Sequence, residues 1–320
     1  MLVDPRYLTW CRGLGPEAEA LQKPEDAAQR LTTGSYLVVS HGPKFRIDPA
    51  EKFFCMGSCF AINVSRALIK QGVDVLSWNF DHPRGMALLS QFNTYSMLNE
   101  VEEALLGKVS SGPEAGLVEL SEGRWWDPQL HHGEISSRED ALALRKHVNA
   151  YFARLANADT CIITLGLTEM FWDTVTDLPL NGGPVDWKHA LRTKRFEFRN
   201  PGFSVISQNV NRLCEMVRNV TGGRAKIILT VSPVPLQRTF AEKDIIVASN
   251  YSKACLRTAA EEAARAYDFV DYFPAYEMVT YSPREIVWER DQRHVTNAMV
   301  DHVISTFRAA YMDVPSGGAS

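Results

Sequence analysis

The sequence predicts an α/β fold built on a central, mostly parallel sheet. Short apolar runs of strand length, among them residues 53–57, 160–166 and 226–231, alternate with longer segments whose apolar residues recur at helical spacing. Alternating strands and helices are typical of a doubly wound parallel sheet, whose ligand site lies at the carboxyl ends of the strands. We therefore look for functional residues where the predicted strands end.

The first part of the chain is predicted to lead into a β-α-β unit. Residues 1–35 are mixed in composition, contain several prolines and indicate an N-terminal extension that wraps the domain. Residues 35–40 follow as a strand that pairs at an edge of the sheet. A strand at 53–57, a helix from Phe60 and a second strand at 73–78 then form a right-handed parallel crossover.

The rest of the chain continues the alternation with two interruptions. Residues 107–135 show the alternation of a hairpin, and residues 173–202 form a polar insertion. The other expected elements are a helix at 94–106, a helix that a capping box at 136–139 opens and that runs to about 156, a strand at 160–166, a helix at 203–220, a strand at 226–231, a helix at 249–267, a strand at 269–273 and a last amphipathic helix after His294. We predict one domain over residues 36–312 and a disordered tail at 313–320.

The composition is that of an ordinary globular protein. Of 320 residues, 45% are hydrophobic and 22% charged, and the net charge of −4 offers no broad attraction for nucleic acid or anionic lipid. The six cysteines are widely spread without a CxxC pair, which predicts reduced thiols. No basic leader, membrane-length apolar run or glycine-rich phosphate loop is present. We expect a cytoplasmic protein with no membrane span, no cofactor, no metal and no nucleic-acid partner.

The turn at Gly57, Ser58 and Cys59 is the strongest candidate for a nucleophile. A strand that ends in glycine and continues as a helix presents small side chains beside the helix N-terminus, where free N–H groups favour negative charge. A deprotonated thiol, or the oxyanion of a tetrahedral acyl intermediate, would be stabilised at this point.

A second pair of residues, near the end of the chain, completes the pattern of a catalytic triad. Asp291 precedes His294 by three residues, and an aspartate at this spacing on a turn can accept the imidazole Nδ1–H. Nε2 is then left to take a proton from a nucleophile. Such a pair also occurs as a helix cap or a surface ion pair, so the signal depends on the glycine turn near the start of the chain.

These motifs resemble a known family. Residues 57–61 spell Gly-Ser-Cys-Phe-Ala, the motif that names the GSCFA-domain family, and residues 164–169 and 291–294 resemble its later blocks. The resemblance runs from about residue 35 to 312. That family is grouped with the SGNH/GDSL hydrolases, which are esterases, acyl hydrolases and glycan O-acyltransferases. The resemblance implies their flavodoxin-like three-layer sandwich and a reaction on an acyl group.

The resemblance also orders the candidate nucleophiles. When the turn is aligned with the Gly-Asp-Ser block of the superfamily, Ser58 takes the place of the aspartate and Cys59 that of the nucleophilic serine. We therefore prefer Cys59, whose pKa we expect the helix N-terminus and an adjacent imidazole to lower. Ser58 caps the helix, or is itself the nucleophile if the turn is shifted by one residue. A buried, inert thiol is the structural alternative for Cys59.

The oxyanion hole of the superfamily draws on two further blocks. The resemblance implies an oxyanion hole formed by the turn at Gly57 together with Asn93 and Gly166. Thr168 replaces the amide donor of the usual Gly-x-Asn-Asp sequence. Glu169 would oppose an oxyanion unless it is protonated or turned away. Helix capping and a surface or buried-pair role are the structural alternatives for these residues.

The sequence thus predicts an acyl esterase or O-acyltransferase that forms a covalent acyl-enzyme on Cys59 or Ser58, with His294 as general base and Asp291 orienting it. The resemblance implies an acylated glycan, a small metabolite or an acyl thioester as substrate, without choosing between hydrolysis and transfer. A second hypothesis is a non-catalytic module of the same fold that binds an anion, a glycan or an acyl carrier. A third is a structural partner protein that uses Trp125 and Trp126 as its interface.

Overall fold

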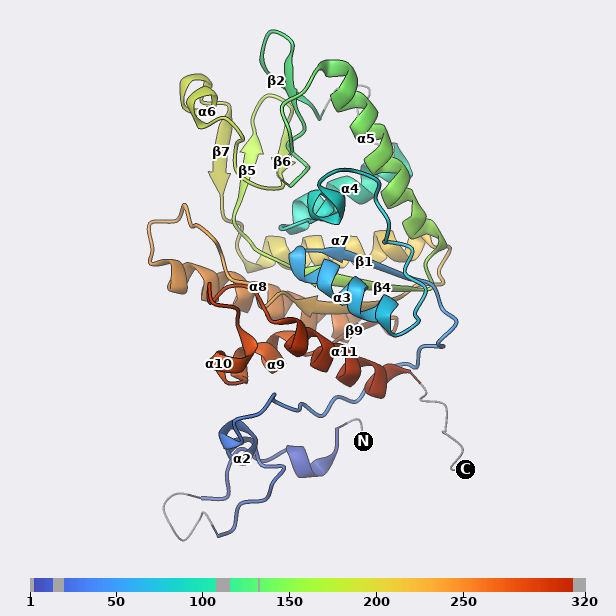
Figure 1. Ribbon diagram of the computed structural model, residues 1–320, viewed down its shortest axis with the longest axis vertical. Coiled ribbons are helices and arrows are strands. Elements are labelled where there is room, and N and C mark those ends of the chain that lie inside the picture. The colour runs from blue at the N-terminus through green and yellow to red at the C-terminus, as the bar shows by residue number, and fades with distance from the viewer. Residues whose placement is uncertain (1–2, 14–19, 108–115, 132, 313–320) are drawn as a thin grey trace.

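A computed structural model describes residues 3–13, 20–107, 116–131 and 133–312 of the chain (Figure 1). The tail predicted at 313–320 lies outside these residues. At the centre is a four-stranded sheet in which every neighbouring pair is parallel. Its strands, in spatial order, are β1 (Phe53–Gly57), β4 (Thr160–Leu165), β8 (Lys226–Val231) and β9 (Val270–Tyr272).

The predicted second strand, at 73–78, is reduced to a single bridge beside β1. Phe53 pairs with Val75, its N–H donates to Asp74 O at 2.8 Å, and its carbonyl accepts the Leu76 N–H at 2.7 Å. When this bridge is counted as the second strand in chain order, the sheet reads 2-1-3-4-5. That order is flavodoxin-like, with the chain reversing direction across the sheet beside β1.

Helices cover both faces of the sheet. Side chains alternate along β1, so Phe54 and Met56 enter one apolar core while Phe53 and Cys55 enter the other. The first core is covered by α4 (Thr94–Leu106), α5 (Arg138–Phe152), α7 (Phe203–Val220) and α8 (Ile245–Ala266), and the second by α3 (Cys59–Lys70), α9 (Ala275–Tyr281) and α11 (Asn297–Tyr311). The predicted three-layer α/β sandwich is therefore confirmed.

Most helix boundaries follow from local capping. The predicted limits of α7 agree with the structure, whereas α8 begins earlier than residue 249 because the Asp244 carboxylate accepts the Ile246 N–H at 2.8 Å. The cap of α5 is Ser137, whose Oγ accepts the Asp140 N–H, so the capping pair lies one residue beyond the predicted 136–139. Among the helices in the described ranges, none combines the length and the hydropathy that crossing a membrane would need.

The two predicted insertions come together as a small unit at one end of the molecule (Figure 1). The first contains the expected hairpin. The second, predicted only as a polar interruption, forms a three-stranded antiparallel sheet and a helix, and its sheet begins three residues earlier, at Met170. Their elements are β2 (Val118–Ser121), β3 (Arg124–Trp126), β5 (Met170–Asp173), β6 (Leu178–Leu180), α6 (Trp187–Thr193) and β7 (Phe196–Arg199). They share one apolar core, made of Val118, Leu120, Trp126, Phe171 and Leu180. We call residues 116–131, 133–136 and 170–199 the cap.

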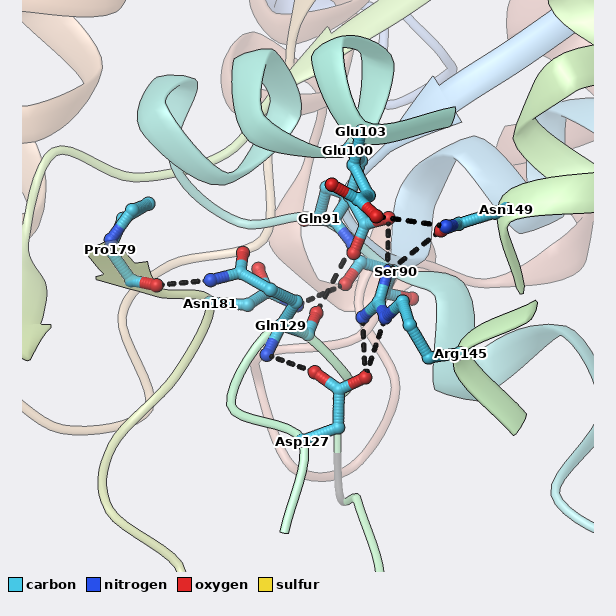
Figure 2. A network of polar contacts seen from close by, with 10 residues as sticks. All are labelled: Ser90, Gln91, Glu100, Glu103, Asp127, Gln129, Arg145, Asn149, Pro179 and Asn181. Carbon is cyan, nitrogen blue, oxygen red and sulfur yellow. Dashed lines mark hydrogen bonds and ion pairs between the residues drawn. The ribbon is translucent and has the colours of Figure 1, made fainter. Parts of the chain in front are cut away.

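A buried polar network joins the cap to the body (Figure 2). Arg145 on α5 donates to Glu100 on α4 at 2.8 Å and to Asp127 of the cap at 2.7 Å. Asp127 also accepts the Gln129 N–H at 2.9 Å, and the Gln129 side chain donates to the carbonyl of Pro179 on β6. Burial raises the pKa of Glu100 to about 7, although Arg145 opposes the shift.

The N-terminal extension lies beside α11, away from the cap (Figure 1). The strand predicted at 35–40 does not form, because the backbone there bonds to side chains rather than to a neighbouring strand. The Leu37 N–H donates to Ser282 Oγ at 2.8 Å, and the Leu37 carbonyl lies 3.2 Å from His302 Nε2. The segment is therefore held by the C-terminal helices without extending the sheet.

Candidate active site

The turn after β1 depends on Gly57. Its φ of +126° is a conformation that residues with a side chain rarely adopt, and a Cβ there would lie 2.1 Å from the Thr164 carbonyl oxygen on β4. Ser58 follows as the N-cap of α3, with its Oγ accepting the Phe60 N–H at 3.3 Å, and is buried. Cys59 is the first residue of α3 and is half-buried. The tight turn thus sets the thiol at the helix N-terminus.

A cavity of about 720 Å³ opens at this point, at the carboxyl edge of the sheet. Cys59 lines it from one side, and Arg293 and His294, in the loop before α11, line it from another. The cap and the loop between β8 and α8 supply most of the remaining wall. The structure therefore brings the two distant motifs of the sequence to one cavity, while Ser58 stays behind the turn and does not line it.

His294 and Asp291 form a hydrogen-bonded pair. The imidazole Nδ1 lies 2.5 Å from Asp291 Oδ2, while Oδ1 accepts the backbone N–H groups of Arg293 and His294, each at 3.0 Å. These hydrogen bonds hold the pKa of the Asp291 carboxyl well below its usual range. The guanidinium Nη1 of Arg293 lies 3.1 Å from Nε2, and a guanidinium can only donate. Nε2 is therefore the acceptor, and Nδ1 carries the proton shared with Asp291.

Lys253 is a cation near the Cys59 thiol that was not predicted from the sequence, and it does not line the cavity. It is buried on α8, and its ammonium donates to the Gly166 carbonyl at 2.7 Å. Burial lowers its pKa to about 7, while the nearby Cys59 thiol acts in the opposite direction. A lysine on the same helix face as the buried Leu256 and Ala260, three and seven residues further on, is the signal that would have found it.

The structure corrects the lowered pKa that the sequence predicted for Cys59. Burial raises the pKa of the thiol above its ordinary value, although Arg293, Lys253 and the N–H groups of Cys59 and Phe60 each act to lower it. The helix N-terminus is in place, as the sequence suggested, and the two cations add to its effect. The lowered pKa is nevertheless wrong for this structure, because removing the sulfur from water outweighs them.

The side chains of two predicted oxyanion donors form hydrogen bonds to other parts of the protein. The Asn93 side chain caps α4 by accepting the Ser96 N–H at 2.8 Å, and its amide donates to the Leu180 carbonyl at 3.0 Å. The Thr168 hydroxyl donates to the side chain of Asn200 at 2.7 Å. Both residues are buried, and neither lines the cavity.

Gly166 and Glu169 lie on the loop between β4 and β5 and have different roles. A Cβ on Gly166 would lie 2.5 Å from the Phe92 carbonyl oxygen, so the glycine permits a close approach of two backbone segments. Glu169 lines the cavity, but its carboxylate accepts the Thr239 hydroxyl at 2.7 Å and the Phe240 N–H at 3.1 Å. The acid is thus bound to the β8–α8 loop.

Comparison with known proteins identifies one family and several distant structures. A model of the GSCFA family matches residues 52–307. No curated protein matches the chain. A family 3 carbohydrate esterase of Clostridium thermocellum is similar over 81% of this chain and 94% of its own, with 8% identity and a TM-score of 0.36. A protein assigned as a GDSL-like lipase, from Parabacteroides merdae, is similar over 84% and 98%, with 12% identity and a TM-score of 0.35.

Proposed function

The chain belongs to the GSCFA family, and we propose that it is an acyl esterase or O-acyltransferase that works through a covalent acyl-enzyme on Cys59. The observation that carries the proposal is that Cys59 and His294, from opposite ends of the chain, line one cavity at the start of α3. A nucleophile, a base and a carboxylate that orients the base are the parts that acyl transfer needs.

The proposed reaction has two halves. Cys59 Sγ attacks the acyl carbonyl carbon while its proton passes to Nε2 of His294, and the N–H groups at the start of α3 hold the oxyanion. The ester C–O bond then breaks, and His294 returns the proton to the departing alcohol. In the second half, water or an acceptor hydroxyl attacks the thioester with His294 again as base, which releases the acid or the new ester and restores the thiol.

Intact-protein mass spectrometry tests the proposal. After brief exposure to p-nitrophenyl acetate and to acyl thioesters, we expect a single acyl adduct that peptide mapping places on Cys59. Cys59→Ala should form none, and His294→Ala should acylate about 10²- to 10⁴-fold more slowly. Cys11→Ala, which removes another half-buried thiol outside the cavity, should behave as the wild type. An adduct that persists in Cys59→Ala would exclude Cys59, and one mapped to Ser58 would move the role there.

A second candidate function is a module that binds an anion without chemistry. Arg238 and Arg293 both line the cavity, and neither forms an ion pair with any side chain that the structure describes. Arg293 also occupies Nε2 of His294, the atom that a base must keep free. For such a module, acyl esters and iodoacetamide would leave Cys59 unmodified, while calorimetry would detect binding of acetate or phosphate that Arg238→Ala weakens.

A further inference from the structure

We propose that the wall of the cavity formed by the cap is an acyl-binding pocket for a long aliphatic chain. This inference rests on the proposed function, since it names the acyl group that Cys59 would receive. The pocket is defined by four aromatic residues: Phe171, Trp187, Phe198 and Phe240. The first three belong to the cap and the last to the β8–α8 loop.

The four rings support one another. Phe240 lies at the centre of the group, 4.9 Å from Phe171 in an edge-on contact, 5.4 Å from Trp187 in a stacked one and 5.9 Å from Phe198. Phe171 also contacts Trp187 at 5.6 Å and Phe198 at 5.7 Å. Rings held by several neighbours form a wall whose shape does not depend on a ligand.

Part of this wall stays exposed. Trp187 and Phe240 are 37% and 38% exposed, although both contact other aromatic rings. The cavity volume of about 720 Å³ is in the range that encloses drug-sized ligands. An acetyl group would fill a small part of it. A long chain would cover the exposed rings and gain hydrophobic free energy with each methylene.

The polar groups of the pocket favour an aliphatic chain over a sugar. Asn181 lines the cavity, yet its side-chain oxygen accepts the Phe92 N–H at 2.8 Å and its amide donates to the Ser90 carbonyl at 2.6 Å. The Glu169 carboxylate is bound to the β8–α8 loop. Trp187 stacks on Phe240, so one face of the indole that would stack on a pyranose is already covered. Beside the four rings, Asn181 and Glu169 therefore offer a sugar few free hydrogen-bond partners, and the polar side chains of Arg238, Arg293 and His294 line another part of the cavity.

Gly182 allows the pocket to be filled by mutation. This residue lines the cavity, its φ is not positive, and a Cβ built on it would meet no atom within 4 Å. A leucine there would take up space in the cavity without straining the backbone. Gly202 offers a matched control, because it has the same freedom from contacts and lies outside the cavity.

The test is a series of p-nitrophenyl esters from acetyl to dodecanoyl. We expect kcat/KM to rise about two- to fourfold per methylene, so that octanoate exceeds acetate by at least about 50-fold. Gly182→Leu and Trp187→Ala should each reduce the dodecanoyl-to-acetyl ratio at least tenfold. Gly202→Leu and Trp10→Ala, the latter at an exposed tryptophan of the N-terminal extension, should keep the wild-type ratio. A ratio that is flat or falls with chain length, while Cys59 is still acylated, would overturn the pocket and leave the proposed function standing.

A binding measurement keeps the pocket testable if no ester acylates Cys59. Dodecanoate is titrated into the Cys59→Ala protein, and binding is followed by tryptophan fluorescence. Saturable binding that Gly182→Leu abolishes and Gly202→Leu preserves would support the pocket even though the proposed function had failed. The absence of saturable binding would overturn the pocket independently of any catalysis.

Discussion

Opposing effects act on the pKa of the Cys59 thiol. Burial disfavours its thiolate, while Arg293, Lys253 and the N–H groups at the start of α3 favour it, and the net result is a raised pKa. A thiol in this state is not a preformed ion pair with an imidazole. In the proposed mechanism its deprotonation would accompany attack, as for a serine nucleophile, and His294 would act as a general base.

At this scale we predict that Asp291→Asn retains the fold and loses catalysis. Asparagine keeps an oxygen that can accept the N–H groups of Arg293 and His294, so the turn should persist. Its amide cannot accept the Nδ1–H, so the imidazole loses the tautomer with a free Nε2. We expect acylation of Cys59 to slow about 10²- to 10⁴-fold. Stopped-flow p-nitrophenol release would measure this.

Asp301→Asn serves as the control for this prediction, because Asp301 is an exposed carboxylate on α11. It should acylate at the wild-type rate. Wild-type acylation by Asp291→Asn would remove Asp291 from the mechanism, and a lowered melting temperature in the same variant would assign it a role in the turn instead.

At the scale of the element, β1 and α3 position the thiol through one glycine. The turn is tight enough that the Ser58 N–H donates to the Thr164 carbonyl at 3.3 Å and the Gly57 carbonyl accepts the Gln91 N–H at 2.7 Å. The helix cannot shift relative to the sheet without breaking these bonds. The position of Cys59 is therefore a property of the β1–α3 unit.

We predict that Gly57→Ala is far more damaging than Gly72→Ala, a comparison between the two ends of α3. Both glycines have positive φ, but a Cβ on Gly57 would collide with the Thr164 backbone, whereas one on Gly72 would meet nothing within 4 Å. Gly72→Ala should lower the free energy of unfolding by about 1 kcal/mol, and Gly57→Ala by about 3 kcal/mol or more. Urea denaturation measures both values. Equal losses would mean that φ alone, and not the contact with β4, fixes the turn.

At the scale of the whole molecule, the cap is held on the body by the buried network around Arg145 (Figure 2). The network joins α4 and α5 to the cap segment that carries Asp127 and Gln129. A buried guanidinium is stable only while its hydrogen-bond acceptors remain in place, whether or not both acids are ionised. The attachment of the cap, which carries three of the four aromatic rings, therefore includes buried polar contacts that lie outside the cavity.

This arrangement predicts a specific pH dependence of stability. The folded-state pKa of Glu100 is raised to about 7 by burial, so its contribution to stability is complete below about pH 4.5 and is lost as the pH rises through 7. Glu100→Gln cannot ionise and should lack this loss. We expect the variant to gain about 3 kcal/mol relative to the wild type between pH 4.5 and 8.

Urea unfolding at several pH values checks this expectation. Glu103→Gln is the matched control, since Glu103 is a half-buried acid on the same helix that accepts from Asn149 at 3.1 Å. It should show the wild-type pH dependence. Parallel curves for Glu100→Gln and the wild type would show that Arg145 keeps Glu100 ionised throughout this range.

The sequence predicted the body of the fold because its strands and helices carry their own periodic patterns. It failed at 35–40, where apolar residues pack on helices instead of a strand, and at 173–202, where strands of three or four residues are too short to show alternation. The loops at 57–59 and 291–294 could be found because strand ends converge at one edge. Lys253 could have been found from its place on the buried face of α8, whereas the aromatic residues of the cavity could not, since the cap reaches the cavity only through tertiary packing.

The shared core of the cap has a further consequence for comparing relatives. Val118, Leu120 and Trp126 come from one excursion of the chain, and Phe171 and Leu180 from another. A chimera that exchanges only one of these two segments between homologues would combine core residues from two different proteins in the same small core. An exchange of the cap between homologues therefore needs both segments together, as a discontinuous module.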